Sequence, residues 1–321
     1  MNDKKFVHII VWMVLFVTIS ITLLIRFMPE NRYMDGEYPY WKQQKDYSLT
    51  DGDKQEVLLL GDSRMKMGVL ATELSEDAYN LALGGGTPLE MYYSVKRYLQ
   101  HHQKPKAVIV AFGATHFTEM GCYVTRNMYF HYFDENESEE ANARILELDG
   151  KDYRSENVAY QYKMPTIYLR AVVKSILRPR TEYNSDLYLR VANSKGRMFG
   201  NDDKALSEVV PQECRSEHFK PLNSLTYYME KLVKLCLDND IPIYIEQLPM
   251  GNPGYQMLVD SGYMSEYQKF IRMFRDKYGI IVNDEIPLYE ENLFQDGSHL
   301  NLAGAQKLTA EWRKKYYILL N

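Results

Sequence analysis

Five short, mainly apolar segments with strand character restrict the fold of this chain more than any other feature. They span residues 57–60, 79–83, 107–112, 243–247 and 280–282. A run such as 107–112, in which every residue is apolar, is typical of a strand buried on both faces of a parallel sheet. Helical patterns follow at about 68–74, 89–99, 222–238 and 263–278, and from residue 302 to about 320. This alternation predicts an α/β fold, with a three-layer, flavodoxin-like parallel sheet and helices on both faces.

A much longer apolar stretch stands at the amino terminus, over residues 6–25. Its roughly 20 residues are enough to cross a hydrocarbon core of about 30 Å. Lys4 and Lys5 precede it, which favours an amino terminus that stays inside while the rest of the chain faces outward. A cleaved signal peptide is the alternative, but its apolar region would be shorter, and no small-x-small cleavage site follows residue 25. We expect a signal anchor at 1–28, in a single-pass protein of the cell membrane with an extracytoplasmic carboxyl-terminal domain.

The remaining chain divides into a tether, a domain and an insertion. Residues 29–55 are polar, contain two prolines and lack periodicity, so we expect a tether there. The α/β domain then covers 56–321, but its regularity is lost at about 117–220. Because a structureless loop of that length is improbable in a compact domain, we expect a mainly helical or irregular insertion packed over the sheet edge. Within it, we expect 134–140 to form a solvated acidic loop and 165–177 an amphipathic helix.

Composition excludes some classes of function. The net charge is −5 without a concentrated basic run, which argues against nucleic acid as a partner. The three cysteines form no CxxC pair, so we expect neither a metal site nor another cofactor. Cys236 falls in an amphipathic pattern typical of a buried thiol, whereas Cys122 and Cys214 flank the insertion and could form a disulfide outside the cytoplasm. The 27 tyrosines suit either a sugar-binding surface or the filling of loops and core edges.

Two distant segments carry groups suited to acyl transfer. Residues 61–63 read Gly-Asp-Ser directly after the first apolar run, which puts Ser63 at the carboxyl edge of a sheet, where such folds bind ligands. His299 is the best candidate base, and Asp296, three residues earlier, can turn back to fix its tautomer. The alternatives are that Ser63 only caps a helix and that the second segment is an ordinary turn before a helix capped by Asn301.

Residues 84–86 are three consecutive glycines after the second run. Their bare backbone would let an N–H point at a bound oxygen, or would cradle a phosphate. The chain contains no P-loop motif, and this turn is not a G-x-G-x-x-G fingerprint, which weakens a nucleotide-binding interpretation. Ser63 also lies outside any G-x-S-x-G sequence, so it is not the nucleophile elbow of the α/β-hydrolases.

Together these segments resemble the SGNH (GDSL-type) hydrolase superfamily. The similarity rests on 61–63, on 80–87, in which Gly85 falls at the family's oxyanion-hole glycine, and on 296–299, which matches the family's Asp-x-x-His. It covers about 56–116 and 222–318. The resemblance implies that Ser63, Asp296 and His299 are catalytic.

The third family block departs from the pattern. Where the family has Gly-x-Asn-Asp, residues 113–116 read Gly-Ala-Thr-His, so the asparagine that donates to the oxyanion is missing. Thr115 or His116 could substitute for it. The resemblance therefore gives an oxyanion hole of Ser63, Gly85 and, in place of the asparagine, Thr115. Losing such a donor costs about 3–4 kcal/mol of transition-state stabilisation in other enzymes.

The departures themselves resemble a membrane-anchored subset of the superfamily. The members of this subset resemble the chain in Arg64, in the anchor and in the altered third block. They act outside bacterial cells on O-acyl groups of surface polysaccharides, often beside a multi-span membrane acyltransferase. We therefore expect an O-acyltransferase, with acetyl as the acyl group, or an acetylesterase acting on a cell-surface glycan. The alternative is a catalytically inactive scaffold or a glycan-binding component of a membrane assembly.

Overall fold

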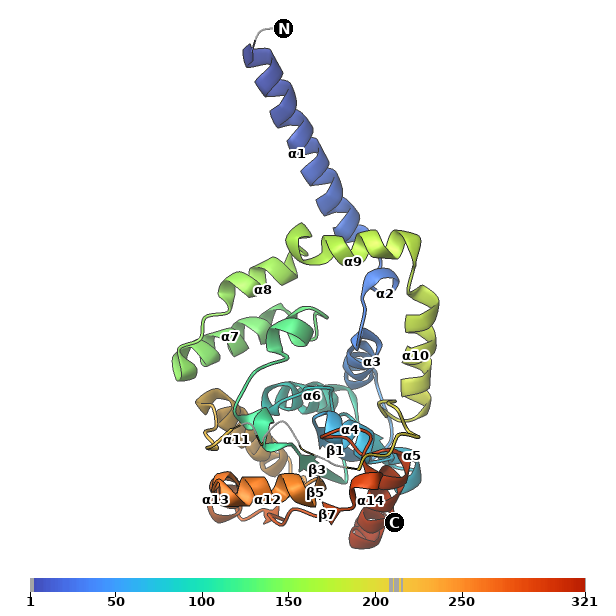
Figure 1. The fold of residues 1–321 in the computed structure, drawn as a ribbon, viewed down its shortest axis with the longest axis vertical. Helices are drawn as coiled ribbons and strands as arrows, with labels where there is room; N and C mark the ends of the chain where they lie inside the picture. Colours follow the sequence, from blue (N-terminus) through green and yellow to red (C-terminus); the bar gives the residue numbers. More distant parts are fainter. Residues whose placement is uncertain (1–2, 208–209, 211–213, 215, 321) are drawn as a thin grey trace.

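Figure 1 presents the computed structural model of the chain, which describes residues 3–207, 210, 214 and 216–320. Residues 1–2 of the expected anchor, 208–209, 211–213 and 215 of the expected insertion, and 321 lie outside the described part. Helix α1 (Asp3–Phe27) projects from one end of the molecule, and the carboxyl terminus lies at the other end (Figure 1). This helix is long and apolar enough to cross a membrane or to serve as a signal sequence.

The centre of the molecule is a five-stranded parallel sheet with the strand order β2-β1-β3-β4-β6. Its strands are β1 (Val57–Gly61), β2 (Ala78–Asn80), β3 (Ala107–Ala111), β4 (Ile243–Ile245) and β6 (Ile281–Val282). Numbered along the chain, these strands have the flavodoxin-like order 2-1-3-4-5. A separate parallel pair joins β5 (Met250–Gly251) to β7 (Leu288–Tyr289). The fold predicted from the sequence is confirmed.

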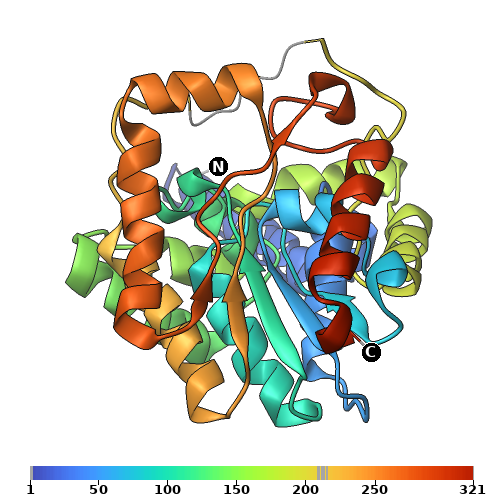
Figure 2. The same ribbon diagram turned by 90° about the horizontal axis from the view of Figure 1, so that it is seen from below.

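Helices cover both faces of the sheet, as Figure 2 shows. One face carries α6 (Pro88–His101), α11 (Asn223–Asp238) and α13 (Tyr263–Tyr278), and the other carries α4 (Ser63–Gly68), α5 (Ala71–Leu74) and α14 (Leu302–Lys315). Shorter connections are η1 (Ala114–Phe117), α12 (Asn252–Asp260), η4 (Glu291–Leu293) and α15 (Tyr317–Leu320). In β1, Leu58 and Leu60 pack into the core between the sheet and α6, α11 and α13. Val57 and Leu59 pack into the core on the other face, under α4, α5 and α14. All four side chains are fully buried, which explains why this run is apolar throughout.

The tether expected at 29–55 is instead folded. It contains α2 (Glu30–Tyr33) and α3 (Tyr38–Leu49), and α3 packs against α6 and α10 (Thr181–Asn193). Two buried amides on α3 bond to strand β2: Gln43 donates to the Tyr79 hydroxyl at 2.7 Å, and Gln44 donates to the Asn80 carbonyl at 2.8 Å. Because part of its buried face is polar, the hydropathy pattern does not reveal this helix.

The insertion between β3 and α11 is helical over most of its described length. It comprises η2 (Tyr123–Met128), α7 (Glu135–Asp149), α8 (Arg154–Gln161), α9 (Pro165–Leu177) and α10. Helix α9 has the expected bounds. The helices form an outer layer, in which α7 packs on α11 and α10 on α3 (Figure 1). The expected position over the sheet edge holds for the start of the insertion, where Arg126 donates to the Gly84 carbonyl at 3.3 Å, and for the loop after α10, where the Asn80 N–H donates to the Lys195 carbonyl at 3.0 Å.

The prediction of a solvated acidic loop at 134–140 is wrong, because Asp134 caps α7 and the residues after it form the start of that helix. Asp134 accepts a hydrogen bond from the Glu137 N–H at 2.8 Å, and the Glu137 carboxylate accepts one from the Asp134 N–H at 3.1 Å. Glu137 also forms a buried ion pair with Arg97 of α6 at 2.7 Å. Acidic side chains stabilise the first turn of a helix, so a cluster of them marks a helix start as readily as a loop.

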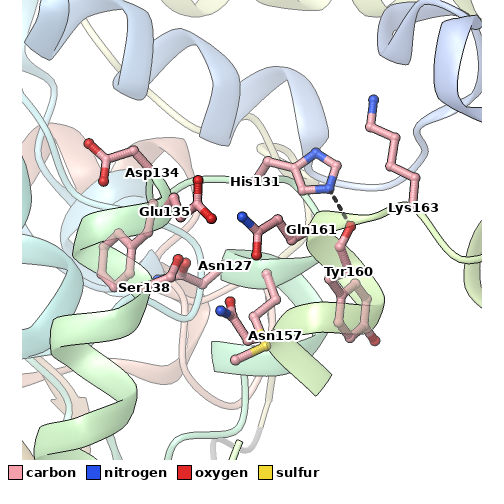
Figure 3. A pocket seen from close by; sticks show the side chains of 11 residues that line it. Asn127, His131, Asp134, Glu135, Ser138, Asn157, Tyr160, Gln161 and Lys163 are labelled. Carbon is pink, nitrogen blue, oxygen red and sulfur yellow. Dashed lines mark hydrogen bonds between the residues drawn. The ribbon is translucent and has the colours of Figure 1, made fainter. Parts of the chain in front are cut away.

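Glu30, just beyond α1, joins the segment that follows α1 to the insertion. Its carboxylate contacts His131 at 2.8 Å and Lys163 at 2.7 Å. Burial raises the pKa of Glu30, but the hydrogen bonds and charges of His131 and Lys163 outweigh burial and lower that pKa to about 2. Figure 3 shows His131 and Lys163 among the residues lining a pocket of about 170 Å³, with His131 bonded to the Tyr160 carbonyl at 3.0 Å. His131 therefore crosslinks this region through both ring nitrogens.

Candidate active site

The candidate site lies at the carboxyl edge of the sheet, where the strand order reverses. The chain passes from β1 to β2 on one side and then to β3 on the other, which opens a crevice beyond the ends of β1 and β3. Ser63 follows β1, Gly85 follows β2, and Thr115 follows β3. His299 arrives from the loop before α14. All four residues line one pocket.

Ser63, His299 and Asp296 are in hydrogen-bonding contact. His299 Nε2 lies 2.7 Å from Ser63 Oγ. His299 Nδ1 lies 2.9 Å from both carboxylate oxygens of Asp296. Asp296 also accepts the backbone N–H groups of Ser298 at 2.8 Å and of His299 at 2.9 Å. Two segments that are remote along the chain therefore form a connected serine–histidine–aspartate arrangement.

The charge of Asp296 fixes the tautomer of His299. Burial raises the pKa of Asp296, but the hydrogen bond and charge of His299 and the two backbone N–H groups lower it to about 2. Asp296 is therefore a carboxylate at neutral pH and accepts the Nδ1 proton of His299. The Nε2 atom of neutral His299 is then left as an acceptor facing the Ser63 hydroxyl.

Asp62, which the sequence analysis treats only as part of a motif, fixes the position of Ser63. It is the N-cap of α4, accepting the Arg64 N–H at 2.7 Å, so the alternative that Ser63 is the cap is wrong. Its other oxygen accepts the Gly113 N–H at 2.6 Å and lies 3.2 Å from His116 Nε2. This fully buried carboxylate therefore ties the end of β1 to the end of β3.

Two glycines are required by the geometry around the site. Gly61 has a φ of +156°, and a Cβ there would lie 2.0 Å from the Ala111 carbonyl oxygen. Gly85 has a φ of +69°, and its Cβ would lie 2.2 Å from Cys122 Sγ and 2.3 Å from Arg126 Nη1. Any larger residue at either position would strain the backbone and displace a neighbour.

The pocket has a volume of about 210 Å³ and mostly polar walls. Its lining residues are Ser63, Arg64, Gly85, Thr115, His116, Glu119, Gly121, Cys122, Arg126, Ser298 and His299. Thr115 is thus in the same pocket as Ser63 and Gly85. His116, the other candidate for that position, is bound to Asp62.

Arg126 and Cys122 are site residues that sequence reasoning missed. Arg126 Nη1 donates to the Gly84 carbonyl at 3.3 Å and to Cys122 Sγ at 2.6 Å, and Nη2 pairs with Glu37 at 2.7 Å. Both residues come from the irregular start of the insertion, which lacks any recognisable motif. The packing around Gly85 is therefore visible only in three dimensions.

No disulfide joins Cys122 to Cys214 in the structure. Cys122 Sγ contacts Arg126, whereas Cys214 Sγ donates to the Gly254 carbonyl at 3.2 Å. Cys236 is buried on α11, as expected, and burial raises the pKa of its thiol to about 12. Across residues 3–207, 210, 214 and 216–320, His, Cys, Asp and Glu side chains form no group that could hold a metal ion. No family model matches this chain, and none of the curated proteins is significantly similar to it.

Proposed function

We propose that this protein is an extracytoplasmic serine-dependent acyl-ester enzyme of the SGNH type, acting on O-acyl groups of a cell-surface polysaccharide. The observation that carries the proposal is the 2.7 Å contact between Ser63 Oγ and His299 Nε2, with Asp296 behind the imidazole. The polar pocket around these groups suits an acetyl ester of a sugar. A multi-span membrane acyltransferase would be the partner that supplies the acyl group.

In this mechanism Ser63 Oγ attacks the ester carbonyl carbon while His299 Nε2 takes the hydroxyl proton. The negative charge that develops on the carbonyl oxygen is met by the N–H groups of Ser63 and Gly85, with Thr115 as the third donor. Asp296 stabilises the imidazolium. His299 then protonates the leaving alcohol, the C–O bond breaks, and acyl-Ser63 remains. Water or a sugar hydroxyl, deprotonated by His299, attacks this ester and releases Ser63.

The choice between transfer and hydrolysis depends on how well the acyl-serine is shielded from water. Glu119, Cys122 and Arg126 from the start of the insertion form one wall of the pocket, which supports transfer to a sugar hydroxyl. Replacing Glu119 by Ala should open this wall and raise hydrolysis relative to transfer. The ratio of acetylated glycan to free acetate, formed from one aryl acetate donor, measures the change.

The same proposal treats α1 as a retained membrane anchor. Ile25, near the end of α1, is fully buried and belongs to the main core of the domain, and Met28 packs against that core. Cleavage after residue 25 would remove part of this packing, which supports retention over a cleaved signal peptide. The catalytic domain would then face outward on a single span.

An active-site phosphonate tests the proposal. It should label Ser63, and both Ser63→Ala and His299→Ala should abolish labelling and lower kcat/KM for an aryl acetate by similar factors, roughly 10³ or more. Ser155→Ala, at an exposed serine of α8, is the matched control and should label normally. Failure to label, together with full activity of Ser63→Ala, would overturn the proposal and favour the scaffold alternative. That alternative is disfavoured by the close approach of His299 to Ser63.

A further inference from the structure

Helix α9 exposes an apolar surface that the domain does not cover. Its inner face, formed by Tyr168, Val172 and Ser175, is buried. Its outer surface includes three largely exposed apolar side chains, Val173 (51%), Ile176 (54%) and Leu177 (84%). Soluble surfaces carry scattered apolar residues, but a cluster on successive turns of one helix indicates a surface that another phase or molecule covers.

The position of α9 identifies what covers this surface. Figure 1 shows α9 lying across the base of α1, and the two helices are in contact. Ser175 Oγ of α9 donates to the sulfur of Met28, the residue that follows α1, at 3.6 Å. If α1 spans a bilayer, α9 lies within about one helix diameter, roughly 10 Å, of the point where the span ends. A helix at this distance from the end of the span lies at the depth of the lipid headgroups.

The charge of α9 suits the same surface. Arg170, Lys174 and Arg178 are spaced four residues apart, so they share one flank, and all three are exposed. No acidic residue occurs between Glu156 and Glu182. A helix with an exposed apolar strip and an adjoining basic flank is the pattern of a helix that lies in the interface of an anionic bilayer.

We propose that α9 is an interfacial helix, with its apolar strip at the acyl-chain boundary and its basic flank against anionic phospholipid headgroups. The inference rests on the proposed membrane span of α1 but not on the proposed catalysis. With α1 spanning the membrane and α9 lying in its interface, the two helices together would fix the orientation of the domain on the membrane. A single span alone would leave the domain free to tilt and rotate.

Tryptophan quenching by lipids with brominated acyl chains tests this in the reconstituted full chain. Trp12 lies within α1 and reports on the span, because Trp41 and Trp312 are buried in the domain. In a Trp12→Phe background, Leu177→Trp should be quenched several-fold more than Ile318→Trp. Ile318 is the matched control, since it is 94% exposed and lies near the carboxyl terminus, at the opposite end from α1.

The outcomes separate the two proposals. Quenching of Trp12 and of Leu177→Trp supports both the membrane span of α1 and the interfacial position of α9. Quenching of Trp12 without quenching of Leu177→Trp overturns the interfacial helix, and it is also the result expected if a protein partner covers α9. If Trp12 itself is not quenched, the membrane span fails, and the inference that depends on it fails too.

A charge variant tests the lipid class. Arg170→Gln with Lys174→Gln should remove the extra quenching of Leu177→Trp seen in phosphatidylglycerol vesicles relative to phosphatidylcholine vesicles. The matched double variant Arg313→Gln with Lys314→Gln, at exposed residues of α14, should leave it unchanged. Equal quenching in both lipids for the unsubstituted helix would overturn the assignment of anionic headgroups.

Discussion

At the scale of single residues, Asp62 shows how one buried carboxylate organises the site. It caps α4 through the Arg64 N–H and holds the Gly113 N–H and His116 with its second oxygen. These contacts set the direction in which Ser63 leaves β1. A carboxylate buried at this position is stable only because each of its oxygens is bonded.

Asp62→Ala should therefore lower the free energy of unfolding by about 2–4 kcal/mol, because it removes a helix cap and leaves buried N–H groups without acceptors. Urea unfolding of the full chain in detergent measures this change. Asp276→Ala, at an exposed aspartate of α13, is the control and should stay within about 0.5 kcal/mol of wild type. Equal stabilities of the two variants would contradict the role given to Asp62.

Asp296 gives a prediction about pH. Its ordinary pKa of 3.8 is lowered to about 2 in the folded chain, so it stays ionised at every pH above about 4. Activity lost between pH 8 and 5 should therefore not come from protonation of Asp296. Asp296→Asn should lower kcat roughly 10³–10⁴-fold, because the imidazole loses its tautomer control. Profiles of kcat/KM against pH for both proteins make the test, and an Asp296→Asn protein within tenfold of wild type would refute it.

The sequence predicts these residues unequally, for a physical reason. Ser63, Asp296 and His299 are found because each sits in a short motif whose chemistry is local. Arg126 and Cys122 act on Gly85 across more than thirty intervening residues, so their roles depend on packing that no local pattern records.

At the scale of elements, the contact between η2 and the glycine turn is the least expected feature of the site. The Gly84 carbonyl and the Gly85 N–H belong to one planar trans peptide and point in opposite directions. By holding the Gly84 carbonyl, Arg126 sets the direction of the Gly85 N–H. Arg126 is itself held by Glu37, which directly precedes α3. Arg126 is thus a positioning residue rather than a catalytic one.

Arg126→Gln should lower kcat about tenfold or more while changing KM much less, because the donor it aligns acts mainly in the transition state. Steady-state kinetics with an aryl acetate give the two constants separately. Arg144→Gln, which removes another arginine of the insertion from an exposed pair with Glu147, should leave both constants unchanged. A rise in KM at constant kcat would instead indicate that Arg126 binds substrate.

Elements differ in how well the sequence predicts them. Strands β1 and β3 are found because both faces are buried and every residue is apolar. Helix α3 is missed because it buries Gln43 and Gln44, whose amide nitrogens find hydrogen-bond acceptors on β2. A polar residue that finds its hydrogen bonds only in the folded state looks like a surface residue in the sequence.

At the scale of the whole molecule, the segment that follows α1, which contains α2, and the insertion act as one support between α1 and the sheet. Glu30 contacts His131 and Lys163, and α9 packs on α1 and α2. The sequence predicts an anchor, a domain and an insertion, but it treats them as separate units. Their union depends on ion pairs between residues more than a hundred positions apart, which periodicity cannot reveal.

Glu30→Gln tests this support through the pH dependence of stability. Glu30 has an ordinary pKa of 4.5 and a folded-state pKa of about 2, so its contribution is complete above about pH 4.5 and is lost as the pH falls toward 2. The contribution is on the order of 3 kcal/mol. Wild type should be more stable than Glu30→Gln at pH 7, and the gap should close between pH 4.5 and 2. A gap independent of pH would contradict the ion-pair account.

The central claim is that the imidazole of His299 activates the hydroxyl of Ser63. The most direct measurement is a mass spectrum of the full chain, quenched with acid during turnover of an aryl acetate. An acetyl group should appear on Ser63 in the wild-type chain and be almost absent from His299→Ala. An unmodified Ser63 during turnover, or acetylation of Ser63 at the same rate without His299, would contradict it.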